Sequence, residues 1–414
     1  MSSRRSLLRA SIGVAGLAAP GAMRRAWAQA APAEAQVALI APLSGPLARQ
    51  GIQMRMGASM AIDEINAAGG VKALGGAKMK LIEVDAEDST EKAKSAAQRL
   101  IADYPGVIGG TGAWLSSFTL AVTEVTERAG LPWLTVSYAD SITDRGFRYV
   151  FQTSLISAKM AETVMPMIAE LGRRMSGKPL TRIGVLSNNT AANVTFLKPI
   201  RERIAGELGM KLVVDEIYSP PLADPTPVIQ PLRAAKPELM LFLPSDVAED
   251  KLLLDSMNSF GLGHGKVPLI SFGTHFATAE LLNAVGKEEL EGAMVVEGNW
   301  GARGQEEVIR RFADRTGEKW MNQDSIATYG DILIFKEALE RAGVADREKV
   351  AAAIRAMDMR DGPAMFYPSR HIKFDAKGRC EDAKVVLVQW QDGVPQAGFP
   401  PELATAEPIW PKSG

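Results

Sequence analysis

The sequence has few of the residues from which metal and redox centres are built. Among its 414 residues it contains a single cysteine, Cys380, so an internal disulfide and a cysteine metal cluster are both excluded. Its three histidines, His264, His275 and His371, lie far apart in the sequence and lack the spacing of metal ligands. We therefore expect the protein to use neither a metal ion nor a cofactor.

The sequence also lacks a strong charge of either sign and a long apolar run. Its formal net charge is −1 and it has no long basic segment, which argues against a nucleic acid partner because such binding depends on clustered Lys and Arg. No apolar run is long enough to span a bilayer, so we expect no direct membrane anchor. The length exceeds the roughly 250–300 residues at which single hydrophobic cores stop growing, which predicts two lobes.

The stretch from Ile108 to Gly130, IGGTGAWLSSFTLAVTEVTERAG, has the order strand, glycine turn and helix that also occurs in nucleotide-binding and catalytic turns. A dinucleotide fingerprint requires a third glycine where this chain has Leu115, and a phosphate loop requires a lysine, which the stretch lacks. A nucleophile elbow requires flanking glycines that neither Ser116 nor Ser117 has. We therefore interpret the stretch as a ligand-binding turn, and we predict that the protein is not an enzyme.

Residues 1–30 resemble a twin-arginine export signal. Arg4 and Arg5 precede a weakly apolar segment that is too short to span a bilayer, and small residues follow this segment. We expect this signal peptide to be removed by cleavage between Ala28 and Ala30 and the mature protein to be periplasmic. Because no cysteine follows the apolar segment, we expect no lipid anchor at the cleavage site.

Apolar strand patterns alternate with helical patterns along most of the mature chain. After residue 154 the alternation restarts and supplies a second series of strands. Short turns between alternating elements are typical of βαβ units, so the sequence predicts an α/β fold with two doubly wound parallel sheets. The last β-like segment ends near Gly393, and we expect a Pro-rich tail to close the chain. The main expected strands lie within residues 35–45, 78–88, 105–110, 131–139, 181–189, 210–219, 238–246, 267–273 and 291–300.

Small polar residues follow several of these expected strands. Because ligands bind at the carboxyl ends of the strands in open α/β sheets, these residues are candidates for a ligand-binding site. Hydroxyls, amides and helix N-termini can hold a small carboxylate, whereas the set contains no acid/base pair suited to breaking a bond. Helix capping remains the alternative role for each residue taken alone. The candidates, with Trp114 beside them, are Ser116, Ser117, Ser137 and Tyr138 in the first series and Asn189, Thr190, Ser245, Asp246, Thr274 and His275 in the second.

The segment from Val37 to Val71, VALIAPLSGPLARQGIQMRMGASMAIDEINAAGGV, resembles the opening of the periplasmic solute-binding proteins of the leucine/isoleucine/valine type. Members of that family have a Pro-x-Ser-Gly-Pro loop before a long helix that ends in Ile-Asn-x-x-Gly-Gly. The resemblance covers nearly all of the mature chain, because further segments resemble the family in the same order. These segments are residues 80–90, 131–154, 218–243 and 327–343.

The resemblance implies a type I periplasmic binding fold, in which two lobes are joined by three crossings and close on a ligand between them. It places the crossings near residues 152–157, 298–301 and 370–375. The resulting lobes are residues 31–154 with 300–372 for lobe one, and residues 155–299 with 373–414 for lobe two.

The resemblance also assigns roles to individual residues. The family's serine that holds the ligand carboxylate with neighbouring backbone amides falls on Ser116, with Ser117 as the adjacent alternative. The loop after the fourth strand, which supplies further contacts, falls on Ser137 to Ala139, with Tyr138 projecting its side chain. The lobe-two wall falls on Thr190 to Ala192 and on Ser245 to Val247.

One position departs from the pattern of the family's amino-acid binders. In those proteins an acidic residue after a lobe-two strand pairs with the ligand's ammonium group, whereas this chain has Thr274 at that place and Asp246 as the nearest alternative acid. A buried ammonium without a charge partner costs several kcal/mol. If Asp246 does not reach the cleft, the expected ligand is an aromatic or aliphatic acid, an amide or a urea that lacks an amine.

The function that the resemblance implies is transport. We expect the protein to capture a small carboxylate-bearing solute, such as a branched-chain or other hydrophobic amino acid, and to deliver it as a monomer to an inner-membrane ABC permease and its ATPase. The alternative is a ligand sensor of the same fold.

Overall fold

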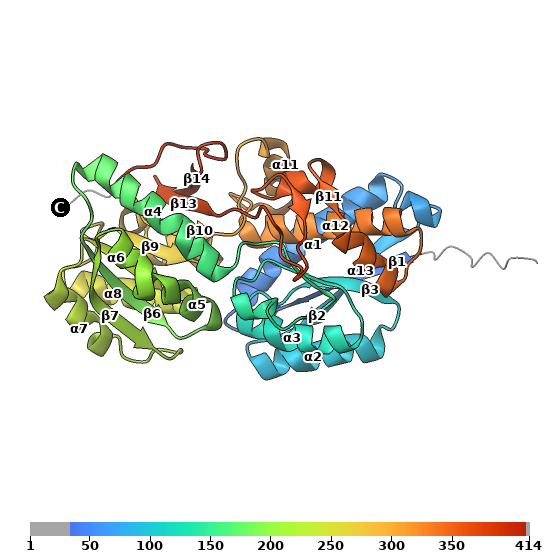
Figure 1. Cartoon of the computed structure of the whole chain (residues 1–414), viewed down its shortest axis with the longest axis horizontal. Helices are drawn as coiled ribbons and strands as arrows, with labels where there is room; N and C mark the ends of the chain where they lie inside the picture. Colours follow the sequence, from blue (N-terminus) through green and yellow to red (C-terminus); the bar gives the residue numbers. More distant parts are fainter. Residues whose placement is uncertain (1–33, 411–414) are drawn as a thin grey trace, which may run out of the picture. The chain divides into compact units, whose positions relative to one another are not determined.

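The computed structural model describes residues 34–410, in which two larger β-sheets are flanked by helices (Figure 1). The first sheet has the strand order β2-β1-β3-β4-β5, and all of its strands run parallel. We call this sheet and the helices packed against it the first lobe. Its strands are β1 (Glu34–Ala41), β2 (Lys78–Asp85), β3 (Val107–Gly112), β4 (Trp133–Thr135) and β5 (Val150–Gln152).

The second sheet has the order β14-β13-β10-β9-β8-β6-β7 and forms, with its helices, the second lobe. Its five strands from β10 to β7 are parallel, whereas β13 and β14 are antiparallel additions at one edge. The strands are β6 (Arg182–Asn188), β7 (Lys211–Tyr218), β8 (Leu239–Leu243), β9 (Leu269–Phe272), β10 (Met294–Glu297), β13 (Val386–Gln391) and β14 (Val394–Phe399). A small two-stranded sheet pairs β11 (Asp358–Met359) with β12 (Ile372–Lys373).

The parallel parts of the two larger sheets share one topology. In each, the first strand in chain order lies next to the second, which forms one edge of the sheet. The third strand lies on the other side of the first, so the direction in which strands are added reverses there. A doubly wound sheet binds ligands at the carboxyl ends of its strands beside this reversal, which lies between β1 and β3 in the first lobe and between β6 and β8 in the second. The predicted α/β fold class is confirmed, and the predicted site loops follow the strands around these reversals.

Thirteen α-helices connect the strands within the described part of the chain. Several begin at polar caps, as at α12, where the Asn322 side chain accepts a hydrogen bond from the Ser325 amide at 3.2 Å. The first lobe is covered by α1 (Ala48–Ala67), α2 (Thr90–Asp103), α3 (Ser116–Arg128), α11 (Glu306–Thr316), α12 (Gln323–Ala342) and α13 (Arg347–Arg355). The second is covered by α4 (Ser157–Ser176), α5 (Ala191–Pro199), α6 (Ala205–Glu207), α7 (Thr226–Ala235), α8 (Val247–Ser259), α9 (Ala279–Val285) and α10 (Lys287–Leu290). Within residues 34–410, no helix has the length and apolar character needed to cross a membrane.

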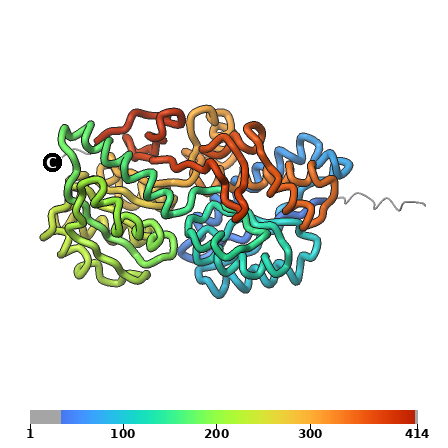
Figure 2. The backbone as a smooth tube through the Cα atoms, viewed as in Figure 1, coloured from blue at the N-terminus to red at the C-terminus, as the bar shows by residue number. Residues whose placement is uncertain are grey.

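The chain passes between the lobes three times, as the tube in Figure 2 shows. The first two passages follow β5 and β10, close to the predicted positions. The third comes later than the stretch predicted near residues 370–375, because Gly378 and Cys380 are still hydrogen-bonded to Gln152 of β5. It therefore lies between Cys380 and Val386.

The end of the chain also differs from the prediction. Residues 394–399 form the edge strand β14 rather than part of an irregular Pro-rich tail. Pro395 and Gly398 weaken the strand pattern in the sequence, but an edge position tolerates a residue that cannot donate to a ladder. The predicted signal peptide at residues 1–30 lies outside the described residues.

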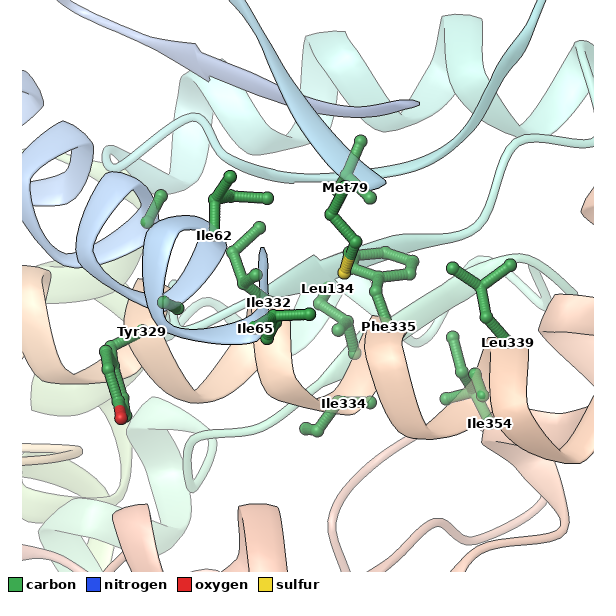
Figure 3. Packing of buried hydrophobic residues seen from close by; sticks show 14 of the residues in the cluster. Ile62, Ile65, Met79, Leu134, Tyr329, Ile332, Ile334, Phe335, Leu339 and Ile354 are labelled. Carbon is green, nitrogen blue, oxygen red and sulfur yellow. The ribbon is translucent and has the colours of Figure 1, made fainter. Parts of the chain in front are cut away.

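The core of the first lobe is formed where α1 and α12 pack against the sheet. Ile62 and Ile65 of α1 meet Ile332 and Phe335 of α12, and Met79 of β2 lies beside them (Figure 3). The two helices approach closely enough for the Thr328 hydroxyl to donate to the Met54 carbonyl oxygen at 2.8 Å. This contact positions the N-terminal end of α12, which carries residues of the site described below.

We expect replacement of Gly57 by alanine to force α1 and α12 apart. A Cβ atom at Gly57 would lie 1.9 Å from the Ser325 carbonyl oxygen, and a backbone atom cannot rotate away. The overpacking should lower the free energy of unfolding by about 2–3 kcal/mol, measured by chemical denaturation. The matched control is Gly206→Ala, where the new Cβ would meet no atom within 4 Å, so a loss of stability there as large as at Gly57 would contradict the prediction.

Candidate functional site

The loop after β3 turns sharply and directs the start of α3 into a cavity. Gly112, Ala113 and Trp114 have φ angles of +109°, +67° and +51°, a conformation that costs energy for the two residues with a Cβ. The turn is held by the Ala113 amide, which donates to the Ile40 carbonyl oxygen at 2.6 Å. A Cβ at position 112 would lie 2.2 Å from that same oxygen, so the turn requires the glycine.

The cavity lies between the strand ends of the two lobes, is partly open to solvent and has a volume of about 60 Å³. Its walls come from the loops after β3 and β4 in the first lobe and after β6, β8 and β9 in the second. No lysine, arginine or carboxylate is among its lining residues. These residues are Trp114, Leu115, Ser116, Ser117, Val136, Ser137, Tyr138, Thr190, Ala191, Ala192, Asn193, Ser245, Phe272, Gly273, Thr274, His275 and Gln323.

The first-lobe wall presents the N-terminus of α3. The amides of the first turn of a helix have no acceptor within the helix and carry a partial positive charge, so this wall suits an anion. The Ser116 hydroxyl accepts a hydrogen bond from the Ala139 amide at 3.1 Å, which leaves its own proton for a ligand. The Ser137 hydroxyl differs, because it donates to the Trp114 carbonyl oxygen at 2.7 Å and therefore fixes the loop.

The second-lobe wall presents the N-terminus of α5. Asn188, buried at the end of β6, accepts hydrogen bonds from the amide and hydroxyl of Thr190 and donates to the Ser245 hydroxyl at 2.7 Å. These contacts fix the loops after β6 and β8 relative to each other. Thr190, Ala191 and Ser245 are thereby held at the cavity wall.

Stacked aromatic rings connect the two walls. The ring of Tyr138 in the first lobe stacks on Phe272 of the second at a centroid distance of 4.8 Å, and Phe272 stacks on Phe196 at 4.5 Å. This arrangement gives the cavity an apolar side beside its polar helix ends.

A buried polar network lies beneath the cavity and joins the lobes. Gln323 accepts hydrogen bonds from the amides of Gly298 and Asn299 at 2.7 and 3.0 Å and from the Tyr138 hydroxyl at 2.5 Å. Its NH₂ group donates to the Thr274 hydroxyl at 3.2 Å. The two backbone donors fix the orientation of the Gln323 amide, so its oxygen faces Tyr138 and its nitrogen faces Thr274.

Two carboxyl groups, Glu297 and Asp324, lie directly behind this network. Both side chains are 0% exposed. The Thr274 hydroxyl lies 3.5 Å from Glu297 Oε2 and 3.3 Å from Asp324 Oδ1. Burial raises the pKa of Asp324 to about 7, and burial together with the nearby Asp324 charge raises the pKa of Glu297 well above its usual range.

His275 reaches the cavity from the second lobe and is held by a buried carboxyl group. Its Nδ1 lies 2.8 Å from Asp250 Oδ2, and its Nε2 has no hydrogen-bond partner among residues 34–410. Burial alone would lower the pKa of His275, but the attraction of the Asp250 charge outweighs it and raises the pKa. The imidazole at the cavity wall therefore holds its proton more readily than a free histidine does.

Nine of the eleven residues predicted from the sequence line this cavity, and two do not. Asp246 caps α8 instead, accepting a hydrogen bond from the Glu249 amide at 2.9 Å. Asn189 bonds to the exposed Ser219 hydroxyl at 2.8 Å. The lining residues are Trp114, Ser116, Ser117, Ser137, Tyr138, Thr190, Ser245, Thr274 and His275.

Sequence reasoning missed Gln323, Phe272 and the two buried acids. Phe272 is the last residue of β9, and Gln323 is the first residue of α12, directly after its Asn322 cap. A cap motif indicates where a helix begins, but it does not indicate which other segments the first turn of the helix contacts. No local signal in the sequence therefore connects Gln323 or Asp324 with Thr274, which lies 49 or 50 residues earlier, or Gln323 with Tyr138, which lies 185 residues earlier.

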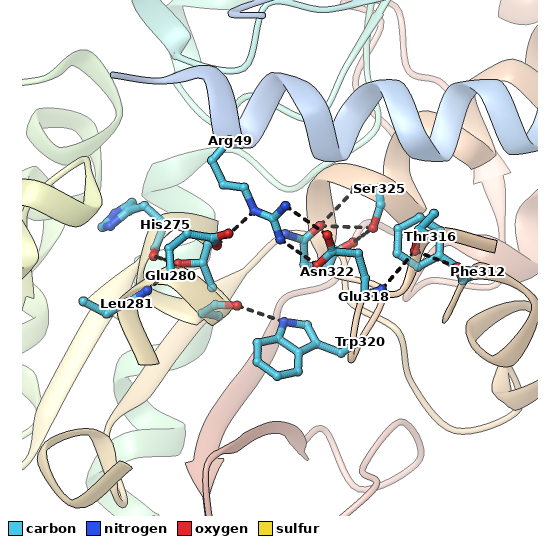
Figure 4. A network of polar contacts seen from close by, with 12 residues as sticks. Arg49, His275, Glu280, Leu281, Phe312, Thr316, Glu318, Trp320, Asn322 and Ser325 are labelled. Carbon is cyan, nitrogen blue, oxygen red and sulfur yellow. Dashed lines mark hydrogen bonds and ion pairs between the residues drawn. The ribbon is translucent and has the colours of Figure 1, made fainter. Parts of the chain in front are cut away.

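A second contact between the lobes lies beside the cavity. Arg49 of α1 pairs with Glu318 at 2.9 and 2.6 Å and also with Glu280 of α9 in the second lobe at 2.9 Å (Figure 4). Nearby, the Trp320 indole donates to the Ala277 carbonyl oxygen at 3.0 Å. These contacts hold the two lobes together around the cavity.

Comparisons with known proteins agree with this architecture. A family model described as periplasmic binding protein matches residues 34–395. The Leu/Ile/Val-binding protein homolog 7 of Brucella melitensis is 29% identical over 395 residues, which cover 92% of this chain and 95% of that protein.

Two solved structures show the same fold. The branched-chain amino acid transporter substrate-binding protein LivJ of Streptococcus pneumoniae, in complex with isoleucine, has a TM-score of 0.74 at 16% identity, with 88% of this chain and 98% of that chain covered. A solute-binding protein of an ABC transporter from R. palustris, in complex with benzoate, has a TM-score of 0.73 at 17% identity, with 90% and 98% covered. The resemblance seen in the sequence is thereby confirmed.

Proposed function

Because the chain belongs to the periplasmic binding protein family, we propose that it is the extracytoplasmic solute-binding component of an ABC importer and that it holds a small carboxylate-bearing solute in the cavity between its lobes. Its family and its structural neighbours are solute-binding proteins, not enzymes. Its partners on this proposal are the solute and an inner-membrane permease with its ATPase. Export to the periplasm, a monomeric state and a division into two lobes, with the third passage after Cys380, belong to the same proposal.

The observation that carries the proposal is the N-terminus of α3 at the cavity wall. A helix N-terminus with a free hydroxyl proton at Ser116 provides the donors that a carboxylate needs, and no arginine is required. Because Ser137 donates its proton within the protein, Ser116 and Ser117 are the hydroxyls proposed to contact the ligand from this wall.

Two classes of solute fit this proposal. A hydrophobic amino acid is supported by the relatives that carry the Leu/Ile/Val-binding name and by the neighbour that holds isoleucine. An aromatic or aliphatic acid without an amine is supported by the neighbour that holds benzoate, by the aromatic wall of Tyr138 and Phe272, and by the role of Asp246, which caps α8 and is not among the lining residues. A sensor role would use the same cavity.

The test is a thermal-shift measurement across amino acids, aromatic and aliphatic acids, amides and ureas. A bound solute should stabilise the protein by about 2.7 kcal/mol at a hundred times its Kd. We expect Ser116→Ala to weaken binding of the stabilising solute by about tenfold, because a hydrogen bond to a charged group is lost. Ser117→Ala is the control at the neighbouring residue, and it should weaken binding of the solute less than Ser116→Ala does.

Two outcomes would contradict this proposal. The first is the absence of stabilisation by any small solute together with measurable turnover of an ester or amide. The second is a normal affinity for carboxylates after Ser116→Ala, because the anion would then not lie at the α3 terminus.

A further inference from the structure

A histidine beside the small sheet holds the start of the third passage between the lobes. His371 directly precedes β12, and its Nδ1 lies 2.5 Å from Asp382 Oδ2 while its Nε2 lies 2.8 Å from Asp358 Oδ1. Asp382 belongs to the passage itself, between Cys380 and Val386. Asp358 is the first residue of β11. The histidine side chain is only 5% exposed, although both carboxylates are open to solvent.

The two contacts of the ring require a proton on each of its nitrogens. A carboxylate only accepts hydrogen bonds, so a ring nitrogen must carry a proton to bond to it. In a neutral imidazole one nitrogen has a lone pair instead, which here would face a carboxylate oxygen. The geometry therefore requires the imidazolium form of His371. In agreement, the hydrogen bonds to Asp358 and Asp382 raise the pKa of His371, and the same bonds lower the pKa of each carboxyl group.

The other charged and titratable groups around the ring do not supply this proton. Arg360, which follows β11, opposes the charge of His371 and lies 4.0 Å from the carboxylate beside Nδ1. On β12, Lys373 pairs with Glu381 of the passage at 2.9 Å. The Cys380 thiol donates to the His371 carbonyl oxygen, 3.6 Å from the sulfur, and not to the ring. His371 is thus the group of this cluster whose charge changes near neutral pH.

The passage leaves the first lobe as a hydrogen-bonded turn. The Glu381 amide donates to the Lys373 carbonyl oxygen at 2.8 Å. The Ala383 amide donates to the Cys380 carbonyl oxygen at 3.4 Å. Asp382 lies between these two amides in the sequence, so its bond to the ring holds the turn against the first lobe.

The far end of the passage is fixed to the second lobe. Lys384 pairs with Glu402, which follows β14, at 2.8 Å. While the ring holds Asp382, the backbone between the two points of attachment is short. Release of Asp382 moves the first point of attachment back toward Cys380, whose amide donates to the Gln152 carbonyl oxygen at 2.9 Å. The segment that can bend then becomes longer.

We propose that His371 is a pH-sensitive anchor of the third passage, in which the imidazolium ring holds the passage to the first lobe through Asp382 and loss of the ring's proton releases it. After this loss one of the two carboxylates has no donor, and water competes for both because they are exposed. The lobes are then joined through a longer flexible segment, which loses more conformational entropy when the lobes are fixed relative to each other. The inference concerns the connection between the lobes and does not depend on which solute binds.

The first measurement is the pKa of His371 in the ligand-free full chain, by NMR with isotope-labelled histidine. The chain has three histidines, so the His371 signal is identified by its absence in His371→Gln. We expect this pKa to exceed the value of about 6.5 for a free histidine and to fall in both Asp358→Asn and Asp382→Asn. A pKa at or below the ordinary value would overturn the proposal.

The second measurement is amide hydrogen exchange at pH 5 and pH 9, expressed as protection relative to the intrinsic exchange rate at each pH. We expect the protection of the Glu381 and Ala383 amides to fall about fivefold between these pH values, the upper end for losing an ion pair with an exposed partner. Asp358→Asn should move this fall to lower pH, because a single remaining carboxylate raises the pKa of the ring less. His371→Gln should remove the pH dependence, because its amide does not titrate.

His264→Gln is the matched control. His264 also lies beside a carboxylate, that of Glu289 at 2.9 Å, but it belongs to the second lobe. Its replacement should leave the fall in protection as it is in the unchanged protein. Thermal unfolding of each variant checks that it is folded.

Two results of the exchange experiment would overturn the anchor. One is equal protection of the Glu381 and Ala383 amides at pH 5 and pH 9 in the unchanged protein. The other is a pH dependence that persists in His371→Gln. Neither result would affect the proposed carboxylate site at the α3 terminus, which Ser116→Ala tests separately.

Discussion

Replacing Tyr138 with alanine should abolish measurable solute binding and lower the free energy of unfolding by about 3–5 kcal/mol, the range for truncating a buried aromatic side chain. The side chain is only 7% exposed and serves both lobes. Its ring stacks on Phe272. Its hydroxyl donates a hydrogen bond to Gln323 and accepts one from the Gly298 amide at 3.2 Å. The substitution therefore removes a cavity wall and a link between the lobes in one step.

The variant Tyr138→Phe separates the ring from the hydroxyl. It keeps the stack on Phe272 but removes the hydroxyl that donates to Gln323. Because buried polar groups are then left without a partner, the free energy of unfolding should fall by about 1–3 kcal/mol. We expect this variant to bind the solute identified for the unchanged protein, with reduced affinity. Both variants are measured by isothermal titration and by urea denaturation.

The outcome for alanine decides whether the aromatic stack belongs to the binding site. A Tyr138→Ala protein that remains folded and binds the solute within threefold of the unchanged protein would contradict the prediction. Loss of binding in both variants to the same extent would assign the effect to the hydroxyl rather than to the ring.

The first-lobe part of the site was predictable because its signals are local. The turn before Ser116 requires Gly112, and the helix that follows begins within four residues of the strand end, so the strand-glycine-helix pattern indicated a helix terminus at this place in the sequence. The parallel fold then placed the loops after β6, β8 and β9 at the same cavity. This is why most of the predicted residues line it.

The two buried acids behind the cavity wall were not predictable, because their position depends on packing between distant segments. Asp324 lies behind the cavity wall because α12 packs against α1 through Thr328, and Glu297 lies there because β10 lies beside β9. In the sequence, Asp324 reads as a favourable acid in the first turn of a helix. Asp246 has the same kind of local signal and is only a cap, so local pattern could not distinguish the two.

Ligand-free protein should lose stability as the pH rises from about 4 to above 7. The pKa of Asp324 is raised to about 7 in the folded protein, and burial also raises the pKa of Glu297 well above its usual range. A carboxyl group with a raised pKa holds its proton more tightly when folded, so its contribution is fully present below the unfolded pKa and is lost as the pH passes the folded value. For Asp324, an increase in pKa from 3.8 to about 7 on folding corresponds to a contribution of about 4 kcal/mol to the free energy of unfolding.

Other groups near the pair act in the same direction. Burial raises the pKa of Asp250 to about 6, and the raised pKa of His275 also makes its contribution decline as the pH rises. The guanidinium of Arg49 stays charged throughout this range. The contribution of the acid pair is therefore measured as the difference between the unchanged protein and its variants.

Urea denaturation between pH 5 and pH 8 tests this prediction. Asp324→Asn should flatten the decline and make the ligand-free protein more stable than the unchanged protein at pH 8, because a neutral amide carries no buried charge. Asp103→Asn, at the exposed end of α2, should leave the decline as it is. A decline that is equally steep in Asp324→Asn and in the unchanged protein would show that Asp324 does not hold a proton in the empty cavity.

The same measurement with a bound solute connects stability to ligand class. A solute whose ammonium group binds beside Glu297 and Asp324 should stabilise the protein more at pH 8 than at pH 5, because the ammonium group compensates the two carboxylates once they have lost their protons. An acid without an amine leaves the two carboxylates unpaired, so its stabilising effect should not grow as the pH rises. Opposite pH trends for leucine and 4-methylpentanoate would thus locate the ligand's amine at Glu297 and Asp324, and parallel trends would place it elsewhere.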